Sequence, residues 1–220
     1  MLTLAISTSS KICSVALLED NQPIKELNID NLKTHSENLV PLIDELFTST
    51  GKKFSDLNLI GCDVGPGSFT GIRIGISTIK AIAEVNEIPV VPCTSLEALS
   101  YNTNSKLICS LIDARNNQVY CGIFNNKHEL IMDYMADDIN IIINNLPKDD
   151  ISFVGDGAIL HKNLLKGVFL EDNNIHGTNI GICAYNKFKK GIYDTADTIV
   201  PMYLRKSQAE RMKELKWRIL

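Results

Sequence analysis

The chain passes from an apolar run into a helix-forming run through Gly65-Pro66-Gly67-Ser68-Phe69-Thr70-Gly71-Ile72-Arg73-Ile74-Gly75. Residues 59–64, just before it, are typical of a buried strand, and residues 76–83, just after it, are typical of a helix. Glycine permits the backbone conformations of such a turn, and Ser68 is a favourable N-cap for a helix whose free N–H groups could hold an anion. The stretch lacks the Gly-Lys-Ser/Thr ending of a P-loop. It therefore predicts a strand, a turn and a helix of an α/β fold.

Two glycines, Gly71 and Gly75, lie one turn apart inside this predicted helix. Glycine in a helix interior is less stable than alanine by about 0.5–1 kcal/mol, so two of them need a structural reason. We interpret them as positions where another backbone approaches closely. This predicts that the helix is a docking surface as much as a ligand site.

The same stretch resembles the signature of the TsaB (YeaZ) family, and further similar blocks follow in the family's order over nearly the whole chain. These blocks are His35-Ser36-Glu37-Asn38-Leu39-Val40-Pro41, Ser95-Leu96-Glu97-Ala98-Leu99, Ile112-Asp113-Ala114-Arg115, Val119-Tyr120 and Pro201-Met202-Tyr203-Leu204-Arg205. The resemblance implies the dimerisation subunit of the bacterial machinery that makes threonylcarbamoyladenosine in tRNA. It also implies the duplicated actin-like ATPase and sugar-kinase (ribonuclease H-like) α/β fold, with two lobes.

Composition fits a soluble globular protein of one large or two small domains, with 220 residues, 45% of them apolar and 22% charged. The net charge of −4 and the pI of 5.6 argue against nucleic-acid binding by the whole molecule, so we expect any tRNA contact to be indirect or weak. The six cysteines form no Cys-x-x-Cys pair and stand mostly in apolar runs, which is typical of buried thiols in a reducing compartment. With no signal-peptide start and no segment of membrane-spanning length, a cytoplasmic protein is expected, without membrane contact.

The two halves of the chain repeat one pattern. Strands are predicted at residues 2–7, 12–19, 24–29, 59–64 and 89–91, and helices at residues 36–48, after the glycine turn, and at 95–101. A shift of 106 positions places Ile6 on Ile112 and Val15 on Cys121, and residues 151–157 again lead from a strand into a glycine turn. We therefore predict a duplicated fold with lobes at 1–104, carrying the partner-binding helices, and 105–220, ending in a basic amphipathic helix.

The first hairpin lacks the acidic residue that the actin-like superfamily uses to hold a metal and phosphate, because Ser7 stands at that position. Residues 8–10 could still bind an anion, but a plain hairpin turn is the preferred interpretation. Asp113 and Arg115 occupy the equivalent hairpin of the second half. With no second carboxylate expected beside Asp113, we interpret both as polar residues of the cleft between the lobes.

The four histidines stand singly, without the His-x-x-x-His pair by which the catalytic relative TsaD binds metal. His35 is interpreted as a helix-start residue, and Gly155-Asp156-Gly157 as a weak resemblance to an adenosine-contacting turn. No cysteine has an adjacent base and no nucleophile elbow is present. We expect no catalytic residue, no cofactor and no metal site.

The partner surface is predicted on the two long helices. The second of them has one apolar stripe at Ile72, Ile76, Ile79 and Ala83 and another at Ile74, Ala81, Ile82 and Val85. Two apolar faces mean either complete burial within the chain or a patch kept for a partner, and the residues alone leave both open. The resemblance implies the second: pairing with the catalytic subunit TsaD, or with a second copy when TsaD is absent, with TsaE joining through the complex. The expected interface residues are Leu39, Ile43, Ile72, Gly75, Ile76 and Ile79, and Gly75→Arg is expected to weaken the complex while leaving the chain folded.

Two other functions stay open at this point. One is a small-molecule kinase of the actin-like superfamily, such as a pantothenate-type kinase, which would need a carboxylate near the first hairpin. The other is a metallopeptidase of the glycoprotease type, which would need a metal pair or an activated nucleophile. The basic segment after Pro201 is interpreted first as a solvated helix, with a subunit or tRNA contact as the hypothesis.

Overall fold

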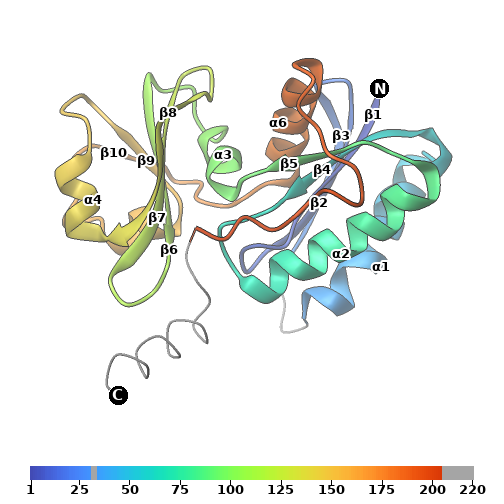
Figure 1. The fold of residues 1–220 in the computed structure, drawn as a ribbon, viewed down its shortest axis with the longest axis horizontal. Helices are drawn as coiled ribbons and strands as arrows, with labels where there is room; N and C mark the ends of the chain where they lie inside the picture. The colour runs from blue at the N-terminus through green and yellow to red at the C-terminus, as the bar shows by residue number, and fades with distance from the viewer. Residues whose placement is uncertain (31–33, 205–220) are drawn as a thin grey trace.

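The computed structural model describes residues 1–30 and 34–204 (Figure 1). The first half runs β1 (Leu2–Ser7), β2 (Cys13–Glu19), β3 (Gln22–Ile29), α1 (His35–Thr50), a 3-10 turn (Phe54–Asp56), β4 (Leu57–Asp63), α2 (Phe69–Asn86), β5 (Val90–Cys93) and α3 (Ser95–Ser100). The second half runs β6 (Leu107–Asp113), β7 (Gln118–Asn125), β8 (Leu130–Asp138), α4 (Ile139–Asn145), β9 (Ser152–Val154), α5 (Asp156–Leu160), β10 (Val168–Phe169) and α6 (Gly177–Lys189).

Each half forms a five-stranded mixed sheet, and the two strand orders are equivalent. The first is β3-β2-β1-β4-β5 and the second is β10-β9-β6-β7-β8. In both, the first strand pairs antiparallel with the second and parallel with the fourth. The predicted duplication is therefore confirmed, down to the pairing of equivalent strands.

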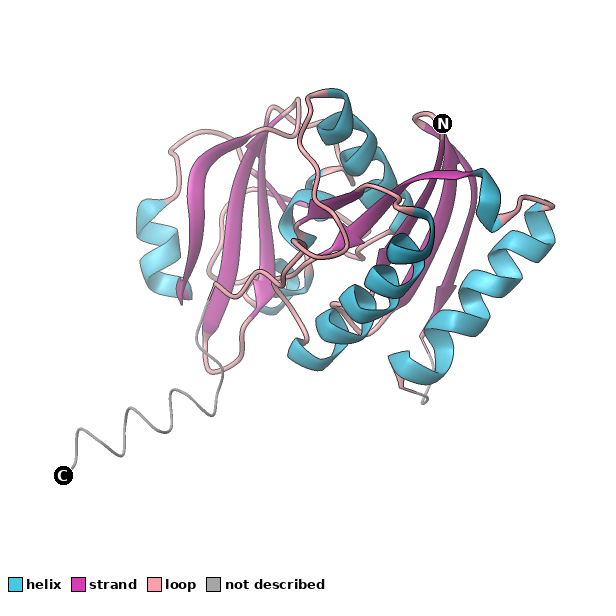
Figure 2. Ribbon diagram, turned by 45° about the vertical axis from the view of Figure 1, so that its right-hand side comes forward, coloured by secondary structure: helices cyan, strands magenta, loops and turns pink. Residues whose placement is uncertain are grey.

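Helices cover both faces of the first sheet. Leu4 and Ile6 of β1 point to the core beneath α1 and α2, whereas Ala5 between them points to the core beneath α6. Figure 2 shows α1 and α2 running beside each other over their face of the sheet. The first lobe thus has three layers, and α1 and α2 form one of its two outer layers.

The two lobes share a core formed by α3 and α6. α3 packs against β6 and β7 of the second sheet, while α6, the last helix of the described residues, packs against β1, β2 and β4 of the first sheet. Residues of both sheets and both helices form one continuous cluster, including Leu18, Leu99, Phe124 and Ile180, each almost completely buried. The interface between the lobes is consequently a hydrophobic core.

After α6 the chain returns to the first lobe as the C-terminal strap, residues 191–204. Asp194 pairs with Val90 at the edge of the first sheet. Ile199 is fully buried in the core under α1 and α2, and the Met202 amide donates a hydrogen bond to the Val64 carbonyl at 2.8 Å. The strap therefore ends beside the glycine turn. The predicted basic terminal helix lies outside the described residues.

Helix ends follow the local chemistry. The N-cap of α1 is Thr34, whose backbone amide donates a hydrogen bond to the Glu37 carboxylate at 2.9 Å. The helix ends at Gly51, which is in the left-handed conformation with φ 68°. α2 begins at Phe69, earlier than the regular run at 76–83 indicates, because Ser68 accepts a hydrogen bond from the Gly71 amide at 3.2 Å. No helix in the described part of the chain is both long enough and apolar enough to span a membrane.

Candidate functional site

The glycine turn joins β4 to α2 and lies against the first hairpin. Gly65 has φ 99°, a conformation that favours glycine, and the Ser68 amide donates to the Ser9 carbonyl at 2.7 Å. Ser68 is the N-cap of α2, as predicted. The start of α2 is thereby fixed to the β1–β2 turn.

Gly71 marks a close approach of another backbone, as predicted, but that backbone belongs to the same chain, and Gly75 meets the Thr8 side chain instead. A Cβ at Gly71 would stand 1.9 Å from the Thr8 carbonyl oxygen, and one at Gly75 would stand 2.5 Å from the Thr8 hydroxyl. The Thr8 hydroxyl also donates a hydrogen bond to the Gly71 carbonyl at 2.7 Å. Both glycines are therefore needed for α2 to pack on its own hairpin, and the close contact is not a partner surface.

A buried carboxyl group, Asp63 at the end of β4, organises this region. Its Oδ1 accepts from the Gly65 amide at 2.9 Å and from the Ser95 hydroxyl at 2.7 Å. Its Oδ2 accepts from the hydroxyls of Ser7 at 2.6 Å and Ser9 at 2.5 Å. The group thus ties together β1, the hairpin turn, the glycine turn and the start of α3. The sequence places Asp63 at the end of an apolar run, a position that signals a buried acid, but we assigned it no role.

The number of hydrogen atoms available for hydrogen bonds in this cluster bears on whether the Asp63 carboxyl is protonated or ionised. The Ser95 and Ser9 hydroxyls also lie 2.9 Å apart, so the cluster has four contacts among the three hydroxyls and the carboxyl. Three hydroxyls supply three hydrogens, and a protonated carboxyl supplies the fourth. Burial raises the pKa of Asp63, although the hydrogen bonds from Ser7, Ser9 and Ser95 act in the opposite direction. The four contacts and the direction of the pKa shift both favour the protonated form of Asp63 more than in an exposed aspartate.

A cleft of about 630 Å³ lies between the lobes, with Ser9, Lys11, Asp113, Arg115 and Asp156 among its lining residues. The expectation that Asp113 lacks a neighbouring carboxylate is wrong, because Asp156 accepts a hydrogen bond from the Asp113 backbone amide at 3.0 Å. Sequence spacing hides this pair, since the two residues follow different strands that become neighbours only in the sheet. Partial burial and the Asp113 charge raise the pKa of Asp156, against the effect of its backbone hydrogen bonds.

The cleft offers three carboxylates, Asp30, Asp113 and Asp156, and two cations, Lys11 and Arg115, a set that could contact a phosphate or a hydrated cation. Among residues 1–30 and 34–204, no group of three His, Cys, Asp or Glu side chains is arranged to hold a metal ion. All six cysteines are buried and free. Burial raises the pKa of Cys13 to about 11, which disfavours its nucleophilic thiolate form.

The histidines are dispersed over the two lobes. His35 is the first residue of α1, as predicted, and its Nε2 lies 2.8 Å from the Ser10 carbonyl. His128 stacks on Tyr101, with ring centroids 3.9 Å apart. His176, the N-cap of α6, contacts Glu26 of β3 at 2.9 Å and Asp172 at 2.7 Å, so it links the start of α6 to β3.

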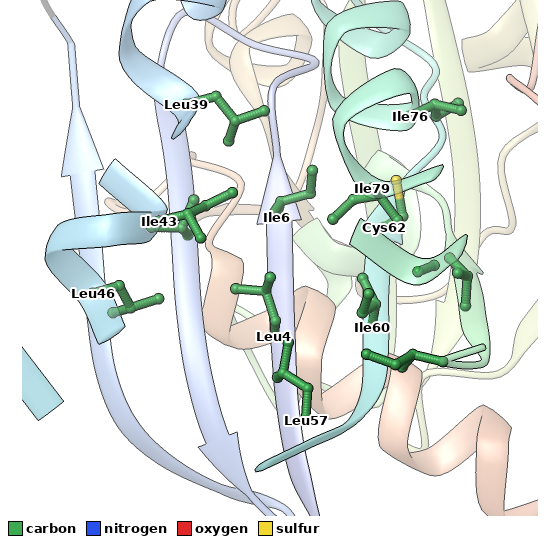
Figure 3. Packing of buried hydrophobic residues seen from close by; sticks show 14 of the residues in the cluster. Leu4, Ile6, Leu39, Ile43, Leu46, Leu57, Ile60, Cys62, Ile76 and Ile79 are labelled. Carbon is green, nitrogen blue, oxygen red and sulfur yellow. The ribbon is translucent and has the colours of Figure 1, made fainter. Parts of the chain in front are cut away.

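The six expected interface residues lie on the inward sides of α1 and α2. Leu39, Ile43, Ile72, Ile76 and Ile79 are each at most 4% exposed, and Gly75 is buried against Thr8. Figure 3 shows Leu39, Ile43, Ile76 and Ile79 pointing toward the strands that carry Leu4, Ile6, Ile60 and Cys62. Any partner surface on these helices must therefore be formed by the residues that face outward between them.

That outward side contains the second apolar stripe of α2. Val85 is 80% exposed, Ala81 is exposed, and Ile74 and Ile82 are half-buried. On α1, Val40 is 59% exposed. Between the helices lies a groove of about 490 Å³, which we call the α1/α2 groove. It is lined by Ser36, Leu39, Val40, Phe69, Thr70, Arg73, Ile74, Ser77 and Thr78.

Comparisons with known proteins identify the family. A family model described as TsaD, tRNA N6-adenosine threonylcarbamoyltransferase, matches residues 30–215. The tRNA threonylcarbamoyladenosine biosynthesis protein TsaB of Bacillus subtilis (strain 168) is 31% identical over 96% of this chain and 96% of its own length. The chain belongs to the TsaB family.

Superposition on solved structures identifies the fold of this TsaB-family chain. YeaZ from Pseudomonas aeruginosa superposes with a TM-score of 0.84 at 24% identity, covering 92% of this chain and 99% of that one. Component A of the Acidaminococcus fermentans (R)-2-hydroxyglutaryl-CoA dehydratase superposes with a TM-score of 0.51 at 11% identity, covering 85% and 98%. Together with the duplicated sheets, these likenesses show that the TsaB-family chain has the two-lobe actin-like fold, as predicted.

Proposed function

We propose that this chain is a non-catalytic subunit of tRNA threonylcarbamoyladenosine biosynthesis that binds and supports the catalytic subunit TsaD through the α1/α2 groove. The proposal depends mainly on one observation: Ile74 of the second apolar stripe lines the α1/α2 groove beside exposed Val40, and Val85 of the same stripe is exposed toward the end of α2. A helix that only covers a sheet needs one apolar face, so a second exposed face on α2 is typical of a binding surface.

Two helices that run beside each other and expose small and branched apolar side chains suit packing against two further helices. Ala81 is small enough for close helix contact, and Ile74 and Val85 supply apolar area at about 25 cal/mol per Å² buried. The same surface would accept a second copy of the chain, so a homodimer that dissociates when TsaD is present belongs to the proposal. TsaE would join through the complex with TsaD.

The first hairpin gives the kinase alternative little support. A superfamily kinase would need a carboxylate on that hairpin directed into the cleft, but the nearby acid, Asp63, is 1% exposed and has hydrogen-bond partners on both oxygens. Asp113 and Asp156 line the opposite lobe of the cleft. The metallopeptidase alternative would need a metal-binding cluster, and the described residues contain no such group.

Light scattering on a sizing column tests the proposal, with the chain alone and then mixed with TsaD from the same organism. We expect a stable heterodimer that forms at the expense of self-association. A chain that elutes unchanged in the presence of TsaD would refute it. Turnover assays on the chain alone, with ATP and small-molecule acceptors, separate the kinase alternative from the subunit proposal.

A further inference from the structure

Arg73, in the first turns of α2, is held in one orientation by two aromatic rings. Its guanidinium carbon lies 3.9 Å from the centroid of the Phe69 ring, and its Nε donates a hydrogen bond to the Tyr203 hydroxyl at 3.0 Å. Tyr203, from the end of the C-terminal strap, is itself stacked on Phe69, with centroids 5.0 Å apart and an interplanar angle of 24°. Two side chains, Phe69 from α2 and Tyr203 from the C-terminal strap, thus hold the Arg73 guanidinium in place.

This cation has no carboxylate partner within the described part of the chain. Stacking on Phe69 and the bond from Nε to Tyr203 leave the two terminal nitrogens of Arg73 as its remaining donors. Those nitrogens form a planar fork that matches the two oxygens of a carboxylate. Because the side chain is already ordered, binding loses less conformational entropy than it would for a free arginine.

The surroundings of Arg73 favour a protein partner. Arg73 and Phe69 line the α1/α2 groove together with apolar Leu39, Val40 and Ile74. α1, on the other side of the groove, carries exposed Glu37, Asp44 and Glu45 and contains no lysine or arginine. Three exposed carboxylates on this helix, none of which lines the groove, would disfavour an RNA backbone, whereas an apolar helix with one acidic side chain would match both the groove and the cation.

We propose that Arg73 is a docking point for a carboxylate side chain of the protein partner that the α1/α2 groove receives, with Phe69 and Tyr203 as its positioning residues. The inference rests on the proposed function, since it specifies the chemistry of the partner surface. It adds the C-terminal strap to the binding surface, because Tyr203 sets the direction of the guanidinium. It also assigns a role to part of the block at residues 201–205.

The test is calorimetric titration of the full-length chain with purified TsaD. Arg73→Lys keeps the charge and removes the fork, and we expect it to weaken binding about tenfold, the effect of losing one bidentate charged hydrogen bond. Tyr203→Phe keeps the ring stack and removes only the hydroxyl, so a loss of about threefold is expected. The matched control is Arg115→Lys, the same exchange at an exposed arginine in the cleft, which should bind like the parent.

Parental affinity of Arg73→Lys, with the parent itself binding TsaD, would overturn the docking role and leave the proposed function intact. Failure of the parent to bind TsaD would instead refute the proposed function. A gel-shift assay with tRNA and the chain alone tests whether Arg73 binds RNA instead. If Arg73→Lys lost tRNA binding but kept TsaD binding, Arg73 would be an RNA contact and the proposal would be overturned. Thermal unfolding of each variant confirms that the exposed substitutions leave the fold unchanged.

Discussion

The Ser7 hydroxyl donates a hydrogen bond of 2.6 Å to the Asp63 carboxyl group, across the neighbouring strands β1 and β4. Ser7, which stands where the superfamily is expected to carry an acid, is thus bonded to an acid on the adjacent strand. Asp63 points into the protein, where Ser9, Ser95 and the Gly65 amide occupy its remaining positions. The group therefore holds the glycine turn in place and is buried away from the cleft.

Replacement of Asp63 by asparagine tests whether this carboxyl is neutral. A carboxyl whose pKa is raised by folding is more fully protonated in the native than in the unfolded state, so its contribution to stability is present below the unfolded pKa of about 3.9 and is lost as pH rises. An asparagine side chain does not titrate, so it loses no stability as pH rises. Asp63→Asn should match the parent near pH 4 and become increasingly more stable than the parent as pH rises toward 8.

Urea unfolding at a series of pH values gives this comparison. Asp63→Leu is the control, since it leaves several buried donors unpaired and should lower stability at every pH, by about 1–3 kcal/mol for each donor. A parent that gains stability over Asp63→Asn as pH rises would show that the carboxyl is ionised.

Gly71→Ala should destabilise the chain by about 3 kcal/mol or more, because the added methyl group would meet the Thr8 carbonyl at 1.9 Å. The sign is informative, since alanine is otherwise favoured over glycine in a helix by about 1 kcal/mol. Thr70→Ala, one position away and exposed, is the matched control and should change stability by less than about 0.5 kcal/mol. Equal midpoints for the two variants in urea would contradict the close-contact explanation.

Gly75→Arg and Ile74→Arg separate folding from binding on α2. Gly75 is buried with Thr8 at 2.5 Å from the position of a Cβ, so Gly75→Arg should unfold the chain rather than leave it folded as the sequence led us to expect. Ile74 lines the α1/α2 groove and is half-buried, so Ile74→Arg should leave a folded chain with at least about tenfold weaker binding of TsaD. Circular dichroism and calorimetric titration read the two effects separately. A folded Ile74→Arg variant with parental affinity would exclude this face.

The contact between His176 and Glu26 should make stability depend on pH. The hydrogen bonds that the His176 ring donates to Glu26 and Asp172 outweigh burial and raise the pKa of His176 from 6.5 to about 9. The stabilisation is therefore complete below pH 6.5 and is lost as pH rises toward 9, by on the order of 2 kcal/mol. His176→Gln should be less stable than the parent at pH 6, with the difference vanishing near pH 10. A difference that stays constant from pH 6 to 10 would contradict the charged pair.

Much of the fold was predictable because strands, turns and helix caps are encoded locally. The strand Leu2–Ser7 and the N-cap at Ser68 match their predictions. Contacts across the sheet were not predictable in this way. The pair of Asp113 and Asp156, and the cluster of Asp63 with Ser7 and Ser95, join residues far apart in sequence that only strand order brings together.

The orientation of α2 at the candidate site was also not predictable from the sequence. Two apolar stripes were visible on α2, but hydrophobicity alone did not show which stripe faces the sheet. The structure decides this through Gly71 and Gly75, which place the stripe of Ile72, Ile76 and Ile79 inward and leave Ile74 and Val85 on the other side. Whether that outer stripe meets a partner stays a prediction.

The exchange of helices between the lobes has a consequence for the order of synthesis. β1, β2 and β4 leave the ribosome first, yet the face of their sheet that carries Ala16, Leu18 and Leu59 is covered by α6, which is translated after all the strands of both sheets. Until Gly177–Lys189 has emerged, a growing chain exposes that apolar surface. The first lobe thus reaches its native form only after the second lobe's strands have been made, and a nascent chain paused before α6 would be a target for chaperones.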